Sequence, residues 1–310
     1  MVDVHRLAPL EHPRCQLAEA PLWDPGEGAL YWADIFGCTV HRLAADGSHT
    51  AWPTGARVGA LALHVPGRLV AGCKDGVRSL DTATGALPRL LADDPEAGHP
   101  DRRYNDCVVD ADGNLWTGAL DDTGATGRGA LHRIAADGSW TTAMRGVGLA
   151  NGADFSPDGR RLYFTDTVAR TIHVFDHDPA SGRLGPPRPF ARDADCLPDG
   201  LEVDADGCVW SAKHGGGKVV RYRPDGTVDR TIRLPVSNPT SVAFGGPDLD
   251  RLFITTASID LADPGEPARG AGHVFVHADP GAAGLPARRC RLPLPAAPPD
   301  PPAQEKHAAR

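Results

Sequence analysis

The sequence predicts an all-β protein: a six-bladed β-propeller with four-stranded blades around a central channel. The first observation is a short pattern of apolar or aromatic residues followed by small polar ones, which recurs six times. The copies begin at residues 30, 69, 115, 162, 209 and 252, so the spacing is 39 to 47 residues. This period is typical of propeller blades. The second observation is composition, because 36 Gly and 29 Pro in 310 residues favour short strands joined by tight turns.

Each copy is interpreted as the second strand of a blade, and the segments on both sides of it repeat too. A first strand and a turn precede it, as in residues 107–113 (CVVDADG), and a third strand follows, as in residues 39–47 (TVHRLAADG). The Asp-Gly pairs predict hairpin turns, because Gly adopts positive φ without strain. The fourth strands are less regular, as expected of a sheet edge that faces solvent. Residues 2–8 are predicted to supply an outer strand to the last blade and so to close the ring.

Residues 1–292 are predicted to form one propeller domain, followed by a Pro/Ala-rich tail, residues 293–310, whose composition predicts disorder. The chain carries 32 basic and 40 acidic residues, without a long Lys/Arg cluster, so we expect no nucleic-acid binding. No apolar run of 18 residues occurs and the N-terminal segment lacks the apolar core of a signal peptide, so we expect neither membrane insertion nor secretion. Seven scattered cysteines without a CxxC pair predict reduced thiols and a cytoplasmic location.

The repeat also predicts a ring of equivalent positions on the axis, because the first strand of each blade lines the channel. Counting back ten or eleven residues from each second strand reaches Glu19, Val58, Asn105, Asn151, Asp199 and Ser241. Each residue precedes an apolar strand, so we expect the ring at the channel mouth. Four of the six carry carboxylate or amide oxygens, which suit one divalent cation: Ca²⁺, Mg²⁺ or Mn²⁺, or Zn²⁺ or Fe²⁺ with water ligands. Without a cation, one of the two carboxyl groups would have to hold a proton.

An alternative interpretation applies to two of these positions. Asn151-Gly152 and Asp199-Gly200 are also ordinary turn pairs, and either pair alone would favour a turn. Four suitable residues in one register favour the metal site instead. Glu19 supports this interpretation most strongly, because Glu is a poor turn former with no local reason to stand there.

At these residues the sequence resembles the regucalcin (senescence marker protein)/gluconolactonase/luciferin-regenerating-enzyme-like family, over about residues 17–276. The resemblance rests on residues 17–24 (LAEAPLWD), 103–106 (RYND), 151–152 (NG), 198–200 (PDG), 218–226 (KVVRYRPDG) and 239–246 (PTSVAFGG). It implies a six-bladed propeller and often lactonase activity. It also implies that Glu19, Asn151 and Asp199 hold the metal ion, and that Arg103 and Asn105 contact substrate.

The sequence departs from the family pattern at four places. Ala20 replaces a commoner Gly, and Ala150 stands where Ser or Pro is usual. Lys213-His214 replaces a segment that often holds an aromatic residue. Leu120-Asp121-Asp122-Thr123 stands where the family can place a substrate-contacting Glu. These departures leave the metal set intact but leave the substrate open, including the part that Asp121, Asp122 and Thr123 have in binding it.

The predicted function is metal-dependent hydrolysis of a sugar lactone such as gluconolactone. The metal would polarise the lactone carbonyl and lower the pKa of a bound water, with Asp199 as a possible general base. Arg103 and Asn105 would orient the sugar, Arg103 being favoured because its guanidinium has five fixed donors and a permanent charge. The alternative for Arg103 is a surface salt bridge to Asp101 or Asp106. We expect a monomer or a weak homo-oligomer.

A different class of function is a non-catalytic calcium-binding or scaffold propeller, since one fold serves many functions. A scaffold has no need of a carboxylate ring on its axis, which favours the hydrolase. The sequence contains neither a GxSxG motif nor a GxGxxG motif that opens a helix, so neither a serine hydrolase nor a nucleotide cofactor is indicated. His132, His173 and His214 share no register and no metal-binding motif, so none is assigned as a ligand.

Overall fold

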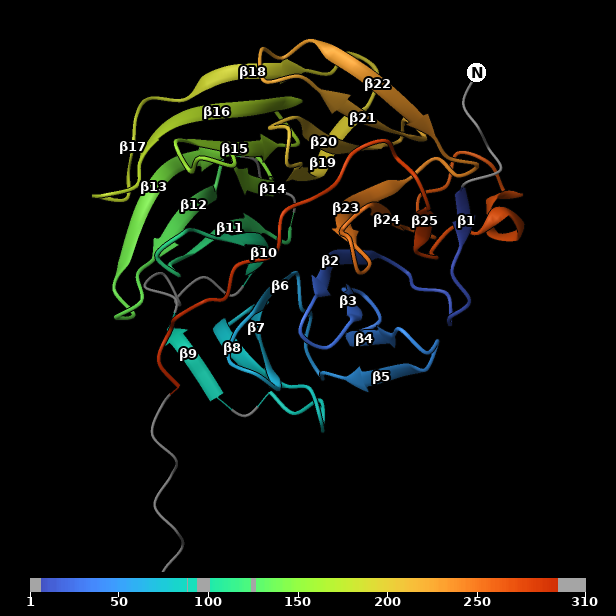
Figure 1. The fold of residues 1–310 in the computed structure, drawn as a ribbon, viewed down its shortest axis with the longest axis horizontal. Helices are drawn as coiled ribbons and strands as arrows, with labels where there is room; N and C mark the ends of the chain where they lie inside the picture. The colour runs from blue at the N-terminus through green and yellow to red at the C-terminus, as the bar shows by residue number, and fades with distance from the viewer. Residues whose placement is uncertain (1–6, 88, 94–100, 124–126, 295–310) are drawn as a thin grey trace, which may run out of the picture.

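The computed structural model describes residues 7–87, 89–93, 101–123 and 127–294. Six antiparallel sheets stand in a ring (Figure 1), which confirms the predicted six-bladed propeller. The predicted boundary after residue 292 and the tail remain a prediction, because residues 295–310 lie outside the described part.

The strands of the first three blades follow one another in the chain. Blade 1 holds β2 (Ala18–Asp24), β3 (Ala29–Asp34), β4 (Thr39–Ala44) and β5 (His49–Pro53). Blade 2 holds β6 (Ala60–Leu63), β7 (Arg68–Cys73), β8 (Gly76–Asp81) and β9 (Arg89–Asp93). Blade 3 holds β10 (Arg102–Val109), β11 (Leu115–Asp121), β12 (Gly129–Ile134) and β13 (Trp140–Val147).

The other three blades repeat this order with two variations. Blade 4 holds β14 (Ala150–Phe155), β15 (Arg161–Asp166), β16 (Thr171–Asp178) and β18 (Arg188–Arg192), with the short β17 (Arg183–Leu184) beside β16. Blade 5 holds β19 (Leu197–Val203), β20 (Val209–His214), β21 (Lys218–Tyr222) and β22 (Val228–Arg233). Blade 6 holds β23 (Pro239–Gly245), β24 (Arg251–Thr256), β25 (Phe275–His277) and, from the other end of the chain, β1 (Leu7–Pro9). The six predicted second strands are thus β3, β7, β11, β15, β20 and β24.

The ring closes as predicted, because β1 pairs antiparallel with β25, from Leu7 opposite His277 to Pro9 opposite Phe275. The strand begins at Leu7, and residues 1–6 lie outside the described part. His12 follows β1 and accepts a hydrogen bond from the Val274 amide (3.0 Å). Its ring centroid lies 4.8 Å from that of Trp32 in blade 1, so the N-terminal segment joins the first blade to the last.

The core consists of apolar clusters between neighbouring blades. In five of the six second strands, an aromatic residue follows the first residue of the repeated pattern, and it is buried, as predicted, at Tyr31, Trp116, Tyr163, Trp210 and Phe253. Trp210 shows how the turns support this packing: its ring lies 5.6 Å from that of Phe244 in blade 6, and its indole N–H bonds to Asp204 in the preceding Asp-x-Asp-Gly turn (2.8 Å). The Asp therefore fixes both the turn and the aromatic side chain.

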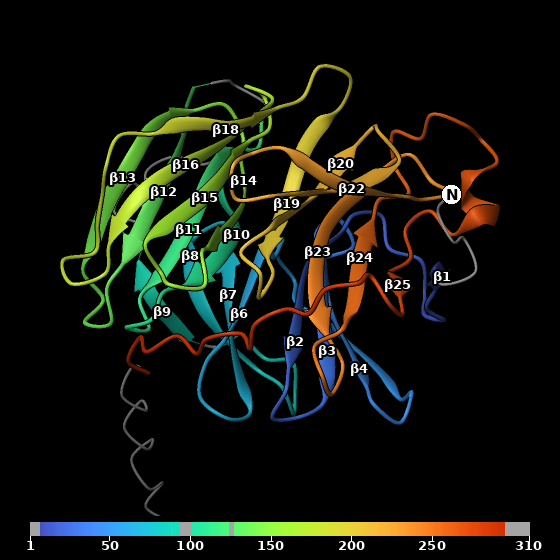
Figure 2. The same cartoon turned by 45° about the horizontal axis from the view of Figure 1, so that its top comes forward.

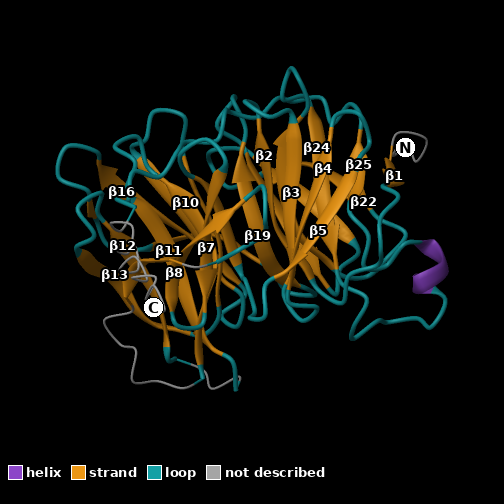
Figure 3. Ribbon diagram, turned by 90° about the horizontal axis from the view of Figure 1, so that it is seen from below, coloured by secondary structure: helices purple, strands orange, loops and turns teal. Residues whose placement is uncertain are grey.

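The chain after β25 crosses one end of the channel. Figure 2 shows this segment in orange-red as it runs from blade 6 beneath the central strands. Its far end pairs with blade 2, where Arg289 bridges Leu63, and the Arg291 amide donates to the Gly113 carbonyl in blade 3 (2.9 Å). Figure 3 shows the short 3-10 helix η2 (Glu266–Arg269) in the loop between β24 and β25. Among the described residues, no helix has the length and apolarity needed to span a membrane.

Candidate functional site

The predicted ring residues stand at irregularities of the innermost strands. The pairing of first and second strands shifts register at Glu19 in β2, after Asn105 in β10, after Ala150 in β14, after Pro198 in β19 and before Ser241 in β23. A β-bulge of this kind redirects a side chain, and bulges are common beside functional sites. We expected each ring residue to precede its strand, and this was wrong for five of the six, which lie within their strands. Val58 alone of the six precedes its strand, β6. All six side chains are at least 93% buried, with exposures of 1–7%.

Asn151-Gly152 and Asp199-Gly200 are not turns. Both pairs lie inside strands, β14 and β19, so the turn alternative is wrong. Glycine is needed at these two positions because of close packing. A Cβ on Gly152 would stand 2.2 Å from the Leu201 amide nitrogen, and one on Gly200 would stand 2.0 Å from the Ser241 hydroxyl. The missing side chains let the inner strands of blades 4, 5 and 6 approach one another directly below the ring.

Arg103, Asn105 and Asn151 form a hydrogen-bonded chain across blades 3 and 4. The Arg103 Nη1 donates to Asn105 Oδ1 (2.6 Å), and Asn105 Nδ2 donates to Asn151 Oδ1 (2.8 Å) and to the Ala150 carbonyl (3.0 Å). Asn105 therefore uses both ends of its amide on protein groups. Its first effect is on the orientation of Asn151, and its predicted contact with substrate stays a prediction.

The chain continues through Thr167, which sequence reasoning missed. Asn151 Nδ2 donates to Thr167 Oγ1 (3.0 Å), and that hydroxyl donates to the Pro198 carbonyl of blade 5 (2.8 Å). The Asn151 amide is thereby held with its nitrogen toward Thr167 and its oxygen toward Asn105. Because Pro198 precedes Asp199, these bonds link two of the predicted ligands.

The carboxyl groups of the site are buried and incompletely paired. The Oδ1 of Asp199 is buried without a hydrogen-bond partner among the described residues, and so is the Oδ2 of Asp106. Within the described ranges, Glu19 Oε2 accepts a hydrogen bond only from the amide of the next residue, Ala20 (2.9 Å). Unpaired buried carboxyl oxygens are costly, which is why such atoms commonly face an ion or water.

The electrostatics of the site oppose ionisation in the absence of a cation. Burial raises the pKa of Glu19 well above its usual range, and the charges of Asp199 and Asp106 raise it further. Burial also raises the pKa of Asp199, Asp106 adds to that rise, and the Arg103 guanidinium opposes it. Burial raises the pKa of Asp106 to about 7. The site thus concentrates negative charge that a bound cation would stabilise.

These residues suit a divalent ion by the chemistry of their donors. Two carboxyl groups, Glu19 and Asp199, and the amide oxygen of Asn151 are hard oxygen ligands, and one Asp199 oxygen has no other partner in the described chain. Within the described part of the chain, no group of three or more His, Cys, Asp or Glu side chains is placed to hold a metal ion by itself. The candidate set is therefore a mixed carboxylate and amide set.

The backbone after two of the ring residues is left-handed. Ala20 follows Glu19 with φ of 50°, and Asp106 follows Asn105 with φ of 46°. This conformation costs a non-glycine residue about 1–2 kcal/mol, which gives a physical reason for the Gly that the family prefers at the position of Ala20. The strain lies at the two bulges that aim Glu19 and Asn105.

Arg103 is paired with Asp122 rather than with Asp101 or Asp106. Its Nε lies 2.5 Å from Asp122 Oδ1, and the Arg57 Nη1 lies 3.2 Å from Asp122 Oδ2. Arg57 also stacks over Phe36, with its guanidinium carbon 4.7 Å from the ring centroid. Because Arg57 leads into β6 and Phe36 follows β3, this group spans the mouth of the channel from blade 1 to blade 3.

Asp121 and Thr123 take no part in that group. Asp121 accepts hydrogen bonds from the amide of Thr123 (2.9 Å) and pairs with Arg128 (3.2 Å). Of the three residues left open by the sequence, Asp122 is therefore the one that bears on the predicted substrate contact, through Arg103.

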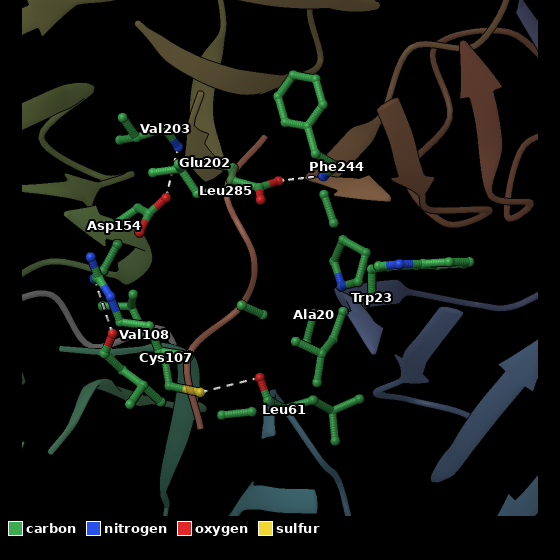
Figure 4. A pocket seen from close by; sticks show the side chains of 18 of the residues that line it. Ala20, Trp23, Leu61, Cys107, Val108, Asp154, Glu202, Val203, Phe244 and Leu285 are labelled. Atoms are coloured by element: carbon green, nitrogen blue, oxygen red, sulfur yellow. Dashed lines mark hydrogen bonds between the residues drawn. The ribbon is translucent and has the colours of Figure 1, made fainter. Parts of the chain in front are cut away.

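Beyond the ring lies a cavity of about 150 Å³ (Figure 4). Two carboxyl groups line it: Asp154 accepts the Val203 amide of the next blade (2.7 Å), and Glu202 accepts the Phe244 amide of the blade after that (2.6 Å). Burial raises the pKa of Asp154 to about 6 and that of Glu202 well above its usual range. Residues 285–288 also line this cavity. These two carboxyl groups join neighbouring inner strands.

Comparison with known proteins bears directly on this arrangement. The family model described as "SMP-30/Gluconolactonase/LRE-like region" matches residues 17–258, which include all six ring positions. The chain belongs to this family. The expected family is thus confirmed, and the match spans five complete blades and the inner two strands of the sixth.

Three relatives show the range of the family around this chain. The pentonolactonase XacC of Haloferax volcanii is 37% identical over 251 residues, 79% of this chain and 83% of its own length. The 6-deoxy-6-sulfogluconolactonase of Pseudomonas putida is 38% identical over 244 residues, 78% of this chain and 83% of its own. The crystal structure of a calcium-binding regucalcin of Agrobacterium tumefaciens shares 31% identity, with a TM-score of 0.86 over 92% of this chain and 97% of its own.

Proposed function

We propose that this protein hydrolyses a sugar lactone at the mouth of the channel, with one divalent cation held by Glu19, Asn151 and Asp199. The observation that carries the proposal is the unpaired, buried Oδ1 of Asp199 in a ring of oxygen ligands beside a fixed guanidinium. The lactonase relatives, at 37% and 38% identity, support the reaction class. The experiment described below is designed to identify the ion and the lactone.

Arg103 binds the substrate in this proposal. Its Nε and Nη1 are occupied by Asp122 and Asn105, and the described residues give its Nη2 no partner. That nitrogen donates to an oxygen of the lactone. Because the guanidinium is buried and held at two points, it loses little freedom when substrate binds.

Asp199 moves the proton. Its carboxylate takes a proton from the attacking water as the water oxygen bonds to the carbonyl carbon, and it returns this proton to the ring oxygen when the ester bond breaks. The product is the open hydroxy acid. The bound cation supplies Lewis-acid stabilisation of negative charge on the carbonyl oxygen and keeps the buried carboxyl groups ionised.

The test is an assay of several aldonolactones with chelated protein and with added Ca²⁺, Mg²⁺, Mn²⁺, Zn²⁺ or Fe²⁺. We expect chelation to abolish ester cleavage and one equivalent of the right ion to restore it. The ion should also raise the melting temperature with its concentration, because it binds only the folded site. Full activity in protein shown by elemental analysis to be metal-free would refute the role of the cation.

The same experiment separates the lactonase from a non-catalytic calcium-binding propeller, an alternative supported by the similarity to the Agrobacterium tumefaciens regucalcin, which is a calcium-binding protein. Ion-dependent stabilisation without cleavage of any lactone would favour the binding protein. We retain the cytoplasm as the proposed location, supported by seven cysteines that are all free thiols. A monomer or weak homo-oligomer also stays a prediction.

A further inference from the structure

His214 is the last residue of β20 and stands at the level of Arg103. It pairs with Leu197, two residues before Asp199, just as Leu120 pairs with Arg103, two residues before Asn105. The equivalent position, within one residue of the end of the second strand, holds Ile35, Leu120, Thr167 and Ala257 in blades 1, 3, 4 and 6, and blade 2 turns back after Cys73. An imidazole is thus peculiar to blade 5 at this level.

The side chain of His214 is directed toward blade 6. Along β20, Trp210 and Ala212 pack against blade 6, in the cluster that contains Val242. Lys213 points the other way, with its Nζ 2.8 Å from Asp193. Because successive side chains of a strand alternate between its faces, His214 shares the face of Trp210 and Ala212.

On that side, the side chain of Asn238 connects the turn after His214 to blade 6. Its Oδ1 accepts the Gly215 amide (3.2 Å), and its Nδ2 donates to the carbonyls of Ile259 and Asp260 (2.9 and 3.0 Å). The turn after His214 is therefore fastened to the β24–β25 loop of blade 6. The imidazole is held at the junction of blades 5 and 6 rather than left on a mobile turn.

This junction lies across the mouth from Arg103. Asp122 joins Arg103 to Arg57, which leads into blade 2, so Arg103 stands at the junction of blades 2 and 3. In a ring of six blades (Figure 1), the junction of blades 2 and 3 is opposite that of blades 5 and 6. A molecule bound over the ligand ring therefore lies between the guanidinium of Arg103 and the imidazole of His214.

The imidazole has unused hydrogen-bonding capacity. His214 is half-buried, and the described residues give it no hydrogen bond, in contrast to His177, whose Nδ1 bonds the Gly159 carbonyl (2.7 Å). Burial lowers the pKa of His214, and the charge of Asp260 opposes that shift. A neutral imidazole offers one donor and one acceptor, which matches a sugar hydroxyl.

We propose that His214 hydrogen-bonds a hydroxyl group of the lactone on the side opposite Arg103, and so selects hydroxylated lactones. This inference rests on the proposed lactonase function and deepens it. A half-buried polar ring without a protein partner gains most from a ligand that satisfies it, and an unsubstituted lactone ring cannot do so.

The experiment compares an aldonolactone with δ-valerolactone, which has no hydroxyl groups, in the ion-loaded protein. His214→Ala should lower kcat/KM for the aldonolactone about tenfold, the scale of one hydrogen bond, and leave that for δ-valerolactone unchanged. His214→Gln, which retains a donor and an acceptor, should recover part of the loss. His173→Ala is the matched control, because His173 on β16 is also half-buried, its Nδ1 has no bond in the described chain, and burial lowers its pKa.

The outcomes separate the two proposals. Equal losses on both lactones, or no loss on either, would overturn the role of His214 while the lactonase function stands. Wild-type protein that cleaves neither lactone would overturn the function and with it this inference. If His214→Ala does not fold, as judged by circular dichroism, His214→Leu, which fills similar space without a donor or an acceptor, takes its place in the comparison of the two lactones and decides the question.

Discussion

The side-chain nitrogen of Asn105 lies 2.8 Å from the amide oxygen of Asn151, so a predicted substrate residue bonds directly to a predicted metal ligand. The nitrogen of Asn151 is fixed by Thr167 at 3.0 Å. Together these bonds prevent the Asn151 amide from rotating, and they leave its oxygen in the ring. Partners that orient a ligand in this way strongly affect the affinity for a metal ion.

Asn105→Ala should therefore weaken cation binding about 10- to 100-fold, the usual effect of removing such an orienting partner. The measurement is a calcium titration followed by calorimetry or by melting temperature. Asn114→Ala is the control: Asn114 is equally buried in the same blade but bonds to Asp110 (2.9 Å). An unchanged ion affinity with reduced turnover would instead support the substrate contact predicted from the sequence.

Asp199→Asn separates the two roles given to Asp199. The amide keeps one oxygen ligand but removes charge and basicity, so ion affinity should fall. With the site saturated by ion, kcat should remain about 10²–10⁴-fold below that of the wild type, the scale of general-base catalysis. Steady-state kinetics at increasing ion concentration measure both effects. A near-normal kcat at saturation would restrict Asp199 to holding the ion.

Asp122→Ala should raise KM about tenfold with a smaller effect on kcat. Asp122 holds the Nε of Arg103 at 2.5 Å, and charge-assisted bonds of this kind are stronger than neutral ones. Without it, the guanidinium keeps its bond to Asn105 but loses its fixed direction. Asp121→Ala, which removes the partner of Arg128, is the control. If both variants behave alike, Asp122 has no specific part in holding Arg103.

The carboxyl group of Asp154 should make the fold less stable as the pH rises. Its pKa is raised from 3.8 to about 6 in the folded protein, chiefly by burial. Its contribution to stability is therefore complete below pH 3.8 and is lost as the pH rises through about 6. The shift of about two units corresponds to about 3 kcal/mol in the free energy of unfolding.

Asp154→Asn cannot ionise, so urea unfolding should show this pH-dependent loss in the wild type and not in the variant. Because the ring carboxyl groups also titrate, the quantity to follow is the difference between the two proteins between pH 4 and 7, with chelator present throughout. A difference that stays constant over this range would mean that Asp154 ionises with an ordinary pKa.

The blade count and the ring positions could be predicted because both are encoded locally. The six second strands recur with one pattern, and the ring residues keep a fixed offset of ten or eleven residues from them. In five of the six blades, the pairing of the first two strands also shifts register beside the ring residue. The predicted starts of the inner strands were wrong in five of the six blades. For example, β10 begins at Arg102, three residues before Asn105.

The partners within the site could not be read in the same way. Asp122 reaches Arg103 because Arg102 pairs with Asp121 across the β10–β11 hairpin, a register set by the bulge after Asn105. Asp101 and Asp106, the salt-bridge partners expected for Arg103, are its neighbours in sequence, whereas Asp122 lies across the hairpin. Thr167, the residue after β15, supports Asn151, and its hydroxyl bonds to a carbonyl of another blade, so only the packing of blades reveals its role.

The last blade is assembled from both ends of the chain, and this sets the order of events during synthesis. Leu7 pairs with His277, so the N-terminal strand leaves the ribosome long before its partner strand has been synthesised. Blades 1 to 5 can form in turn, while blade 1 lacks the neighbour that will cover its outer flank. Closure is thus the final step, and it joins segments more than 260 residues apart, the kind of distant pairing that slows folding and prolongs exposure to aggregation.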